Sequence, residues 1–145
     1  FDKTFSYFRQ HYMHHNLDTT CPYPGVMEML ESLRSRGKKV AVVSNKFYAA
    51  TQALCKHFFG DLVDVAIGER EGIRKKPAPD TVNEALAQMN VGKERAVYIG
   101  DSDVDIMTAN NCGMPCISVL WGFRDYDFLV EHGATIFVTS PLQLK

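Results

Sequence analysis

The chain alternates short uncharged apolar runs with segments whose apolar residues recur every three or four positions. Residues 40–43, 96–99 and 115–120 contain no charged side chain, which is typical of strands covered on both faces of a parallel sheet. Shorter strands are predicted at 63–68 and 135–138. The helical spacing predicts helices at 26–36, 47–59, 80–89, 104–111 and 128–132. This alternation predicts an α/β fold with a doubly wound, Rossmann-like parallel sheet.

The N-terminal segment has a different pattern. Residues 1–17 are predicted to form a helix, because apolar and aromatic side chains form a stripe at helical spacing: Phe1, Phe5, Phe8, Tyr12 and Met13. His11, His14 and His15 would share one face of that helix. A metal could use such a face, but no carboxylate or cysteine is interleaved, which favours a solvated polar surface. Residues 20–25 predict a turn-rich connector.

Composition narrows the class of protein. The 145 residues are 46% hydrophobic and 23% charged, with a net charge of -1, so one domain with a buried core is expected. The near-neutral charge predicts no nucleic-acid or membrane partner. Four scattered cysteines indicate reduced thiols and a cytoplasmic protein. The pair Cys112 and Cys116 lacks a second Cys or His pair, which argues against zinc.

Three carboxylates follow the predicted strand at 96–99. Asp101, Asp103 and Asp105 follow Gly100, with no Lys or Arg among them. Residues 101–105 form the acid turn. Ligands of open α/β sheets bind at the carboxyl ends of strands, and clustered carboxylates suit Mg²⁺. The alternative is a helix N-terminus, with a capping side chain and acidic residues favoured by the helix dipole. This stretch alone leaves both interpretations open.

Two further polar positions belong with the carboxylates. Ser44 and Asn45 follow the strand at 40–43 and could hold a phosphate at a helix start, or simply cap that helix. Lys76 precedes Pro77 and could offset phosphate charge, or belong to a solvated basic run. Because these positions and the acid turn are expected at one edge of the sheet, together they favour phosphoryl transfer.

In these motifs the sequence resembles the haloacid dehalogenase-like superfamily. Residues 42–46 (Val-Val-Ser-Asn-Lys) look like its second motif. Residues 76–80 (Lys-Pro-Ala-Pro-Asp) look like the third, and 100–105 (Gly-Asp-Ser-Asp-Val-Asp) like the fourth. Residues 121–124 (Trp-Gly-Phe-Arg) are similar to the phosphoglycolate phosphatase-like branch.

The resemblance implies an enzyme that hydrolyses a small phosphorylated metabolite with Mg²⁺, through an aspartyl-phosphate intermediate. Ser44 and the backbone of Asn45 would bind phosphoryl oxygens, and Lys76 would be both catalytic and phosphate-binding. Asp101 would ligate the metal, with Asp105 as a second ligand or an orienting acid. A pyrophosphatase or a sugar-phosphate mutase would use the same core.

One departure from the family pattern bears on the mechanism. The family's nucleophile begins an Asp-x-Asp motif on a central first strand, and no such motif precedes Ser44. The resemblance therefore divides the chain into 1–19, the tail of a helical cap, and 20–145, a core lacking its first strand and drawn from a longer parent. Such a core would need its missing part or another chain, including a second copy. The alternative function is a non-catalytic phosphate-binding Rossmann-like module.

Overall fold

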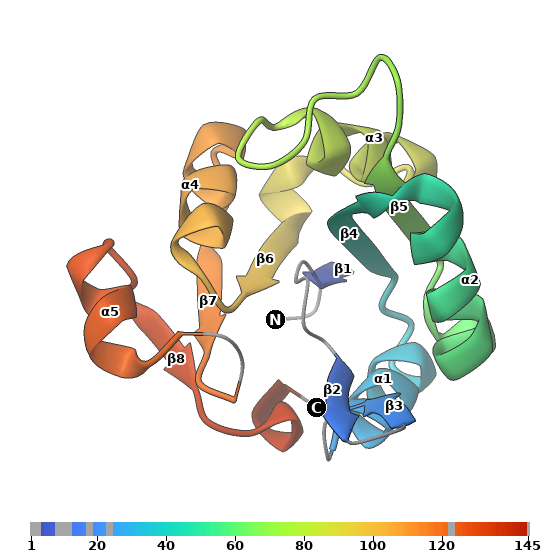
Figure 1. The fold of residues 1–145 in the computed structure, drawn as a ribbon, viewed down its shortest axis with the longest axis horizontal. Helices are drawn as coiled ribbons and strands as arrows, with labels where there is room; N and C mark the ends of the chain where they lie inside the picture. The colour runs from blue at the N-terminus through green and yellow to red at the C-terminus, as the bar shows by residue number, and fades with distance from the viewer. Residues whose placement is uncertain (1–3, 8–12, 17–18, 23–24, 122–123, 145) are drawn as a thin grey trace.

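The computed structural model describes residues 4–7, 13–16, 19–22, 25–121 and 124–144 (Figure 1). Its main feature is a six-stranded sheet with the order β5-β4-β1-β6-β7-β8. All five strand pairings are parallel, as the sequence predicts. The strands are β1 (Thr4–Tyr7), β4 (Val40–Phe47), β5 (Val65–Glu69), β6 (Ala96–Gly100), β7 (Cys116–Val119) and β8 (Ile136–Val138).

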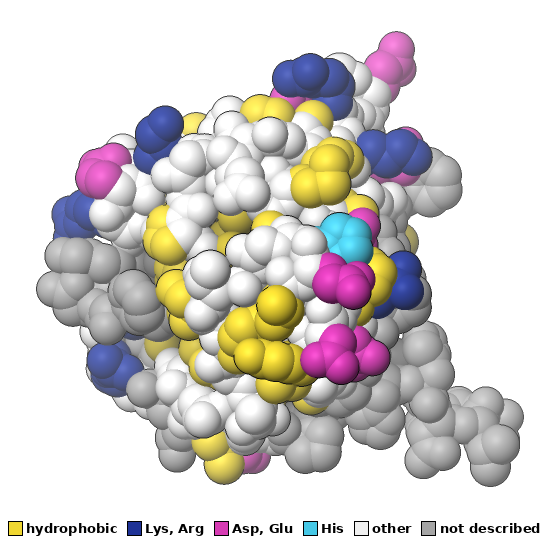
Figure 2. Space-filling view, turned by 90° about the vertical axis from the view of Figure 1, so that its left-hand side faces the viewer, with side chains coloured by type: hydrophobic (Ala, Val, Ile, Leu, Met, Phe, Trp, Pro, Cys, Tyr) yellow, Lys and Arg dark blue, Asp and Glu magenta, His cyan; other side chains and the backbone are white. Residues whose placement is uncertain are grey.

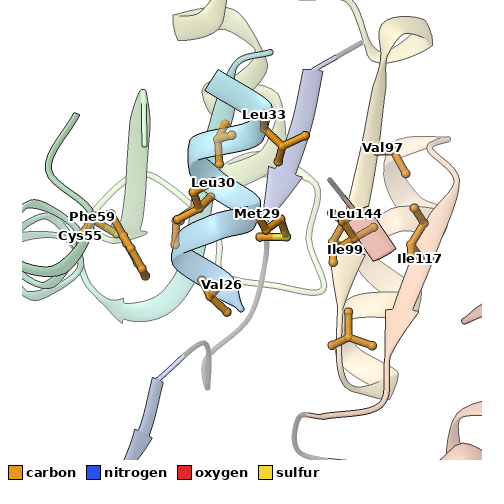
Figure 3. Packing of buried hydrophobic residues seen from close by; sticks show 13 residues of the cluster. Val26, Met29, Leu30, Leu33, Cys55, Phe59, Val97, Ile99, Ile117 and Leu144 are labelled. Carbon is orange, nitrogen blue, oxygen red and sulfur yellow. The ribbon is translucent and has the colours of Figure 1, made fainter. Parts of the chain in front are cut away.

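Helices cover both faces of this sheet. They are α1 (Val26–Ser35), α2 (Tyr48–Phe59), α3 (Asp80–Met89), α4 (Asp103–Cys112) and α5 (Tyr126–Glu131), with 3-10 turns η1 (Gly60–Leu62), η2 (Lys93–Arg95) and η3 (Pro141–Leu144). Buried side chains of α1, α2 and η3 pack against one face (Figure 3). Buried side chains of α3 and α4 pack against the other. The fold is therefore the doubly wound α/β architecture expected.

The helix predicted over residues 1–17 is wrong for the described part of that segment. Thr4–Tyr7 forms β1, in the centre of the sheet between β4 and β6 (Figure 1). Phe5 aligns with Val40 on one side and Val97 on the other. Buried backbone groups of two neighbouring strands need hydrogen-bond partners, and this demand overrides a helical pattern.

The sequence also predicts a core that lacks its central strand. This expectation is wrong, because β1 occupies the central position. The next segment also departs from the prediction: β2 (Met13–Asn16) and β3 (Thr19–Pro22) form a separate antiparallel pair. His14 and His15 lie in β2, so the shared helix face is also wrong for these two residues, and His11 lies outside the described residues. Because Thr4–Tyr7 belongs to the main sheet, the assignment of 1–19 to a cap is wrong for these four residues, and for the rest of that range it stays a prediction.

Elsewhere the predicted elements are found with small shifts. The largest concerns β4, which continues through Ser44 and Asn45 to Phe47 with a register irregularity after Val43. Helix α2 begins only at Tyr48. Ser44 and Asn45 therefore lie within a strand, and the alternative in which they cap the next helix is wrong.

The edge strand β8 and helix α5 form one end of the molecule, opposite β5 and α2 (Figure 1). Hydrophobic side chains gather on this face beside acidic ones (Figure 2). Exposed large hydrophobics here include Tyr126, Val130 and Ile136. Among the described residues, no helix has the length and apolar character needed to cross a bilayer.

Candidate active site

The candidate residues follow from the sheet topology. Ser44 lies within β4, two residues past Val42, and Asp101 directly follows β6, two residues past Ile99. Val42 and Ile99 both align with Tyr7 of β1, so Ser44 and Asp101 are level across the sheet. These strands flank β1 and run parallel to it, so both positions are at the same sheet edge. Ser44 and Asp101 are buried. Open parallel sheets bind their ligands at this edge.

A buried ion pair connects the loop after β5 to helix α4. The Lys76 ammonium lies 2.9 Å from Oδ1 of Asp105, and both side chains are 2% exposed. The neighbouring Lys75 is exposed. Lys76 therefore points inward, and the alternative in which it belongs to a solvated basic run is wrong. A charged pair so far from water is stable only with close geometry and further hydrogen bonds.

The Asp105 carboxylate receives those further hydrogen bonds. Its Oδ1 also accepts the hydroxyl of Tyr98 at 2.7 Å. Its Oδ2 accepts the Asp101 backbone N–H at 2.9 Å and the Ser102 hydroxyl at 3.1 Å. Both carboxylate oxygens are therefore fully engaged within the protein. This arrangement favours the orienting role for Asp105 over the ligand role.

Tyr98 stands on β6 with its side chain fully buried. Burial, then the charge of Asp105 and the hydrogen bond to it, raise the pKa of the Tyr98 hydroxyl well above its ordinary value. The hydroxyl therefore stays protonated and donates a hydrogen bond to the carboxylate. The same two causes, burial first and then the Asp105 charge, raise the pKa of Cys116 to about 12.

Glycine at position 100 makes room for the carboxylate. A Cβ atom added to Gly100 would overlap the Cβ and Cγ atoms of Asp105. Any side chain there would push Asp105 away from the Asp101 backbone. The glycine that ends β6 thus permits close approach of the first turn of α4.

Asn45 fixes the loop that carries Lys76. Its Oδ1 accepts the Lys76 backbone N–H at 3.0 Å, and its Nδ2 donates to the Lys76 carbonyl at 3.4 Å. From the other side, Nδ2 of Asn111 donates to the Pro77 carbonyl at 2.8 Å. The loop is thereby attached to both β4 and α4. The Asn45 side chain therefore positions the backbone of Lys76, and phosphate binding by the Asn45 backbone stays a prediction.

Both interpretations of the acid turn have support in the geometry. Ser102 is the N-cap of α4, and its Oγ accepts the Asp105 backbone N–H at 3.4 Å. Asp103 and Asp105 occupy the first helical turn, where the helix dipole favours acids. Capping accounts for the spacing of the acids, but it does not require a buried lysine beside Asp105. The ion pair therefore indicates more than a capped helix.

The comparison that decides the family is the match to a family model. The model of haloacid dehalogenase-like hydrolases matches residues 1–119. The chain belongs to this family. The match covers the strand ends and loops that carry Ser44, Lys76 and Asp101.

Similar proteins from this hydrolase family carry phosphatase names. The phosphoglycolate phosphatase of Aquifex aeolicus is 33% identical over 117 residues, covering 80% of this chain and 55% of that protein. That of Rhodobacter capsulatus is 37% identical over 103 residues, covering 70% and 46%. A crystal structure from Lactobacillus delbrueckii subsp. bulgaricus, with a provisional phosphoglycolate phosphatase name, is 45% identical with a TM-score of 0.86 and covers 90% and 54%. The chain spans about half the length of these relatives.

The site of this haloacid dehalogenase-like chain suits a hard cation in part. Asp101 supplies a buried carboxylate, and Mg²⁺ is commonly held by one or two carboxylates with water and substrate phosphate. Within the residues that the structure describes, no three His, Cys, Asp or Glu side chains are grouped to hold a metal. The donor chemistry fits Mg²⁺ at Asp101, and the roles of Asp101 and Asp105 as ligands stay predictions.

Sequence reasoning did not identify Tyr98 as part of the site. The available signal was a hydroxyl-bearing side chain in an otherwise apolar strand, three positions before Asp101. A buried tyrosine hydroxyl needs a partner. The sequence could not show which partner, because Tyr98 meets Asp105 only when α4 folds back beside β6.

Proposed function

We propose that the protein carrying this chain is a Mg²⁺-dependent phosphatase of the haloacid dehalogenase-like family, acting on a small phosphorylated metabolite. The observation that carries the proposal is the buried Lys76–Asp105 ion pair at 2.9 Å, held by the turn that also carries Asp101. A buried cation beside a carboxylate at the ligand-binding edge is suited to charge that develops on a transferring phosphoryl group.

Each residue has a distinct part in this proposal. The Lys76 ammonium offsets charge on the phosphoryl oxygens as the bond to phosphorus forms. Ser44, within β4 and level with Asp101 across the sheet, donates its hydroxyl to a phosphoryl oxygen. Asn45 holds the backbone of Lys76, and Asp105 holds its ammonium. Mg²⁺ at Asp101 would neutralise phosphate charge when bound.

The covalent steps come from the family resemblance. An aspartate attacks phosphorus, and the alcohol leaves with a proton from a second acid. Water then hydrolyses the aspartyl phosphate and releases inorganic phosphate. The central strand Thr4–Tyr7 contains no carboxylate, and no Asp-x-Asp precedes Ser44. The proposal therefore takes the attacking aspartate from outside these 145 residues.

The substrate proposed is phosphoglycolate or a metabolite of similar size. The support is the name shared by relatives from Aquifex aeolicus and Rhodobacter capsulatus. A relative from Listeria monocytogenes, 28% identical over 131 residues and covering 90% of this chain and 60% of that protein, is named pyrophosphatase PpaX. Pyrophosphate is therefore the second candidate substrate. A sugar-phosphate mutase and a non-catalytic phosphate binder are the remaining alternatives.

Phosphate release by the purified protein carrying this chain tests the proposal. The assay compares 2-phosphoglycolate, pyrophosphate and a hexose 1-phosphate, each with Mg²⁺ or with EDTA. We expect Mg²⁺-dependent hydrolysis of 2-phosphoglycolate that is lost in Lys76→Met and retained in Lys75→Met, the exposed neighbour. Binding of inorganic phosphate without hydrolysis of any compound would favour the non-catalytic module.

Partners and location stay proposals as well. We propose a cytoplasmic protein whose partner is the phosphorylated metabolite, with no nucleic-acid or membrane partner. Cys112 and Cys116 are free thiols in the structure, which is consistent with a reducing compartment. A homo-oligomer is a proposal that sedimentation of the purified protein would test.

A further inference from the structure

Asp105 of the acid turn binds a buried polar group on β6 that the proposed function does not use. Tyr98 Oη and Lys76 Nζ both donate to Oδ1 of Asp105, at 2.7 and 2.9 Å. All three side chains are buried. Two donors on one oxygen restrict where that oxygen can lie, and the lysine follows the oxygen because it is the partner of its charge.

We propose that Tyr98 is a positioning residue that acts through Asp105 to hold the Lys76 ammonium where phosphoryl charge develops. The inference rests on the proposed phosphatase function. Tyr98 is suited to this part because it belongs to the central strand β6, whose five residues are all buried. Asp105 and Lys76 come from a helix turn and a loop, which are less rigidly held than a central strand.

The two carboxylate oxygens of Asp105 bind different sets of hydrogen-bond donors. Oδ2 is bound by the turn itself, through the Asp101 N–H and the Ser102 hydroxyl. Oδ1 is bound by groups from outside the turn, Tyr98 and Lys76. Loss of the Tyr98 hydroxyl leaves the carboxylate attached to its turn but frees the side that faces the lysine. The expected defect is therefore misplacement of Lys76 in a folded protein.

The test replaces the Tyr98 hydroxyl by groups of matched size. Tyr98 is exchanged for 4-methylphenylalanine, which has no donor, and for 4-aminophenylalanine, which keeps one. Tyr98→Phe is the simpler genetic variant. Tyr126→Phe, which makes the same change on an exposed tyrosine, is the matched control. All variants are made in the protein carrying this chain, and thermal melts confirm folding.

We expect the methyl variant and Tyr98→Phe to lower kcat about tenfold, because misplacing a catalytic group by an ångström or less is costly. KM should stay within about twofold, because Lys76 acts mainly on charge that develops in the transition state. The amino variant should recover most of kcat. Equal kcat in the amino and methyl variants, or methyl-variant activity within about twofold of wild type, would overturn the inference.

A second readout separates this inference from the proposed function. Lys76 is protected from amine reagents by burial, and acetylation followed by mass spectrometry reports its release. The methyl variant should acetylate faster at Lys76 than the amino variant, with Lys75 unchanged. If the wild type hydrolyses no phosphorylated compound, the proposed function fails. The rate of Lys76 acetylation in the methyl variant relative to the amino variant still decides whether Tyr98 holds Lys76. Equal acetylation of Lys76 in the two variants contradicts the inference.

Discussion

Two ion pairs begin two residues apart in one loop, and one is exposed to water while the other is buried. Arg74 and Asp80 meet at 2.7 Å with side chains 74% and 23% exposed. Lys76 and Asp105 meet at 2.9 Å with both side chains 2% exposed. Water and salt screen the first pair, so it contributes little to stability. In the second pair each charge is stabilised by the other, because water is excluded.

The two ion pairs also differ in which parts of the chain they connect. The Arg74–Asp80 pair spans six residues and joins the loop to the start of the helix that follows it. The Lys76–Asp105 pair spans 29 residues and joins two separate parts of the sheet edge. A buried pair is costly to form, so its presence at a ligand-binding edge indicates function more than stability. Four variants would test this contrast, from the largest expected effect to the smallest.

Lys76→Met removes one partner of the buried pair and leaves the Asp105 charge without its cation. Breaking a buried pair in this way costs about 3–5 kcal/mol. We expect a loss of that size in the free energy of unfolding, measured by urea denaturation. The double variant Lys76→Met/Asp105→Leu should regain part of it, because no charge is then left unpaired. A loss as small as that of an exposed lysine would show that water reaches Asp105.

Asp101→Asn should reduce activity at least about a hundredfold, because the metal at this carboxylate neutralises transition-state charge. The Mg²⁺ concentration for half-maximal phosphate release should rise in parallel. Asp103→Asn is the control, since Asp103 is the first residue of α4 and is not buried. Unchanged Mg²⁺ dependence in Asp101→Asn would contradict the metal assignment.

Gly100→Ala places a methyl group against the side chain of Asp105. Overpacking of this kind costs about 1–3 kcal/mol, and the displaced carboxylate should lower kcat as well. Gly92→Ala is the control, because its added Cβ meets only the flexible end of the Glu94 side chain. Equal urea midpoints for the two variants would mean that the turn can move away from β6 freely.

Arg74→Ala should have the smallest effect, and that effect should disappear at high salt. Hydrogen bonds from the Arg74 side chain and backbone lower the pKa of the Asp80 carboxyl in the folded protein. The stability from this pair is therefore present above the unfolded pKa of Asp80 and is lost as pH falls through the lowered folded value. Wild type and Arg74→Ala should converge in thermal melts at acid pH. A difference that persists there would contradict the assignment to Asp80.

The sequence by itself determined most elements of residues 25–144. Helix α3 begins and ends at Asp80 and Met89 as predicted, because Val82, Ala85, Leu86 and Met89 recur at helical spacing and are buried. Strand β6 follows from its uncharged run. The motif positions also place Lys76 and Asp101 at one sheet edge. Local periodicity is enough for these conclusions because each element buries a face that its own pattern defines.

Tertiary structure decided the rest. The segment Thr4–Tyr7 alternates polar and aromatic residues within a longer helical stripe, so its sequence is compatible with either element. The place between β4 and β6 selects the strand, since backbone groups there need partners. Likewise, nothing in the sequence pairs Lys76 with Asp105 or brings Tyr98 to the same oxygen. Those contacts join residues from a loop, a helix and a strand, and only the packing of α4 against β6 brings them within hydrogen-bond distance.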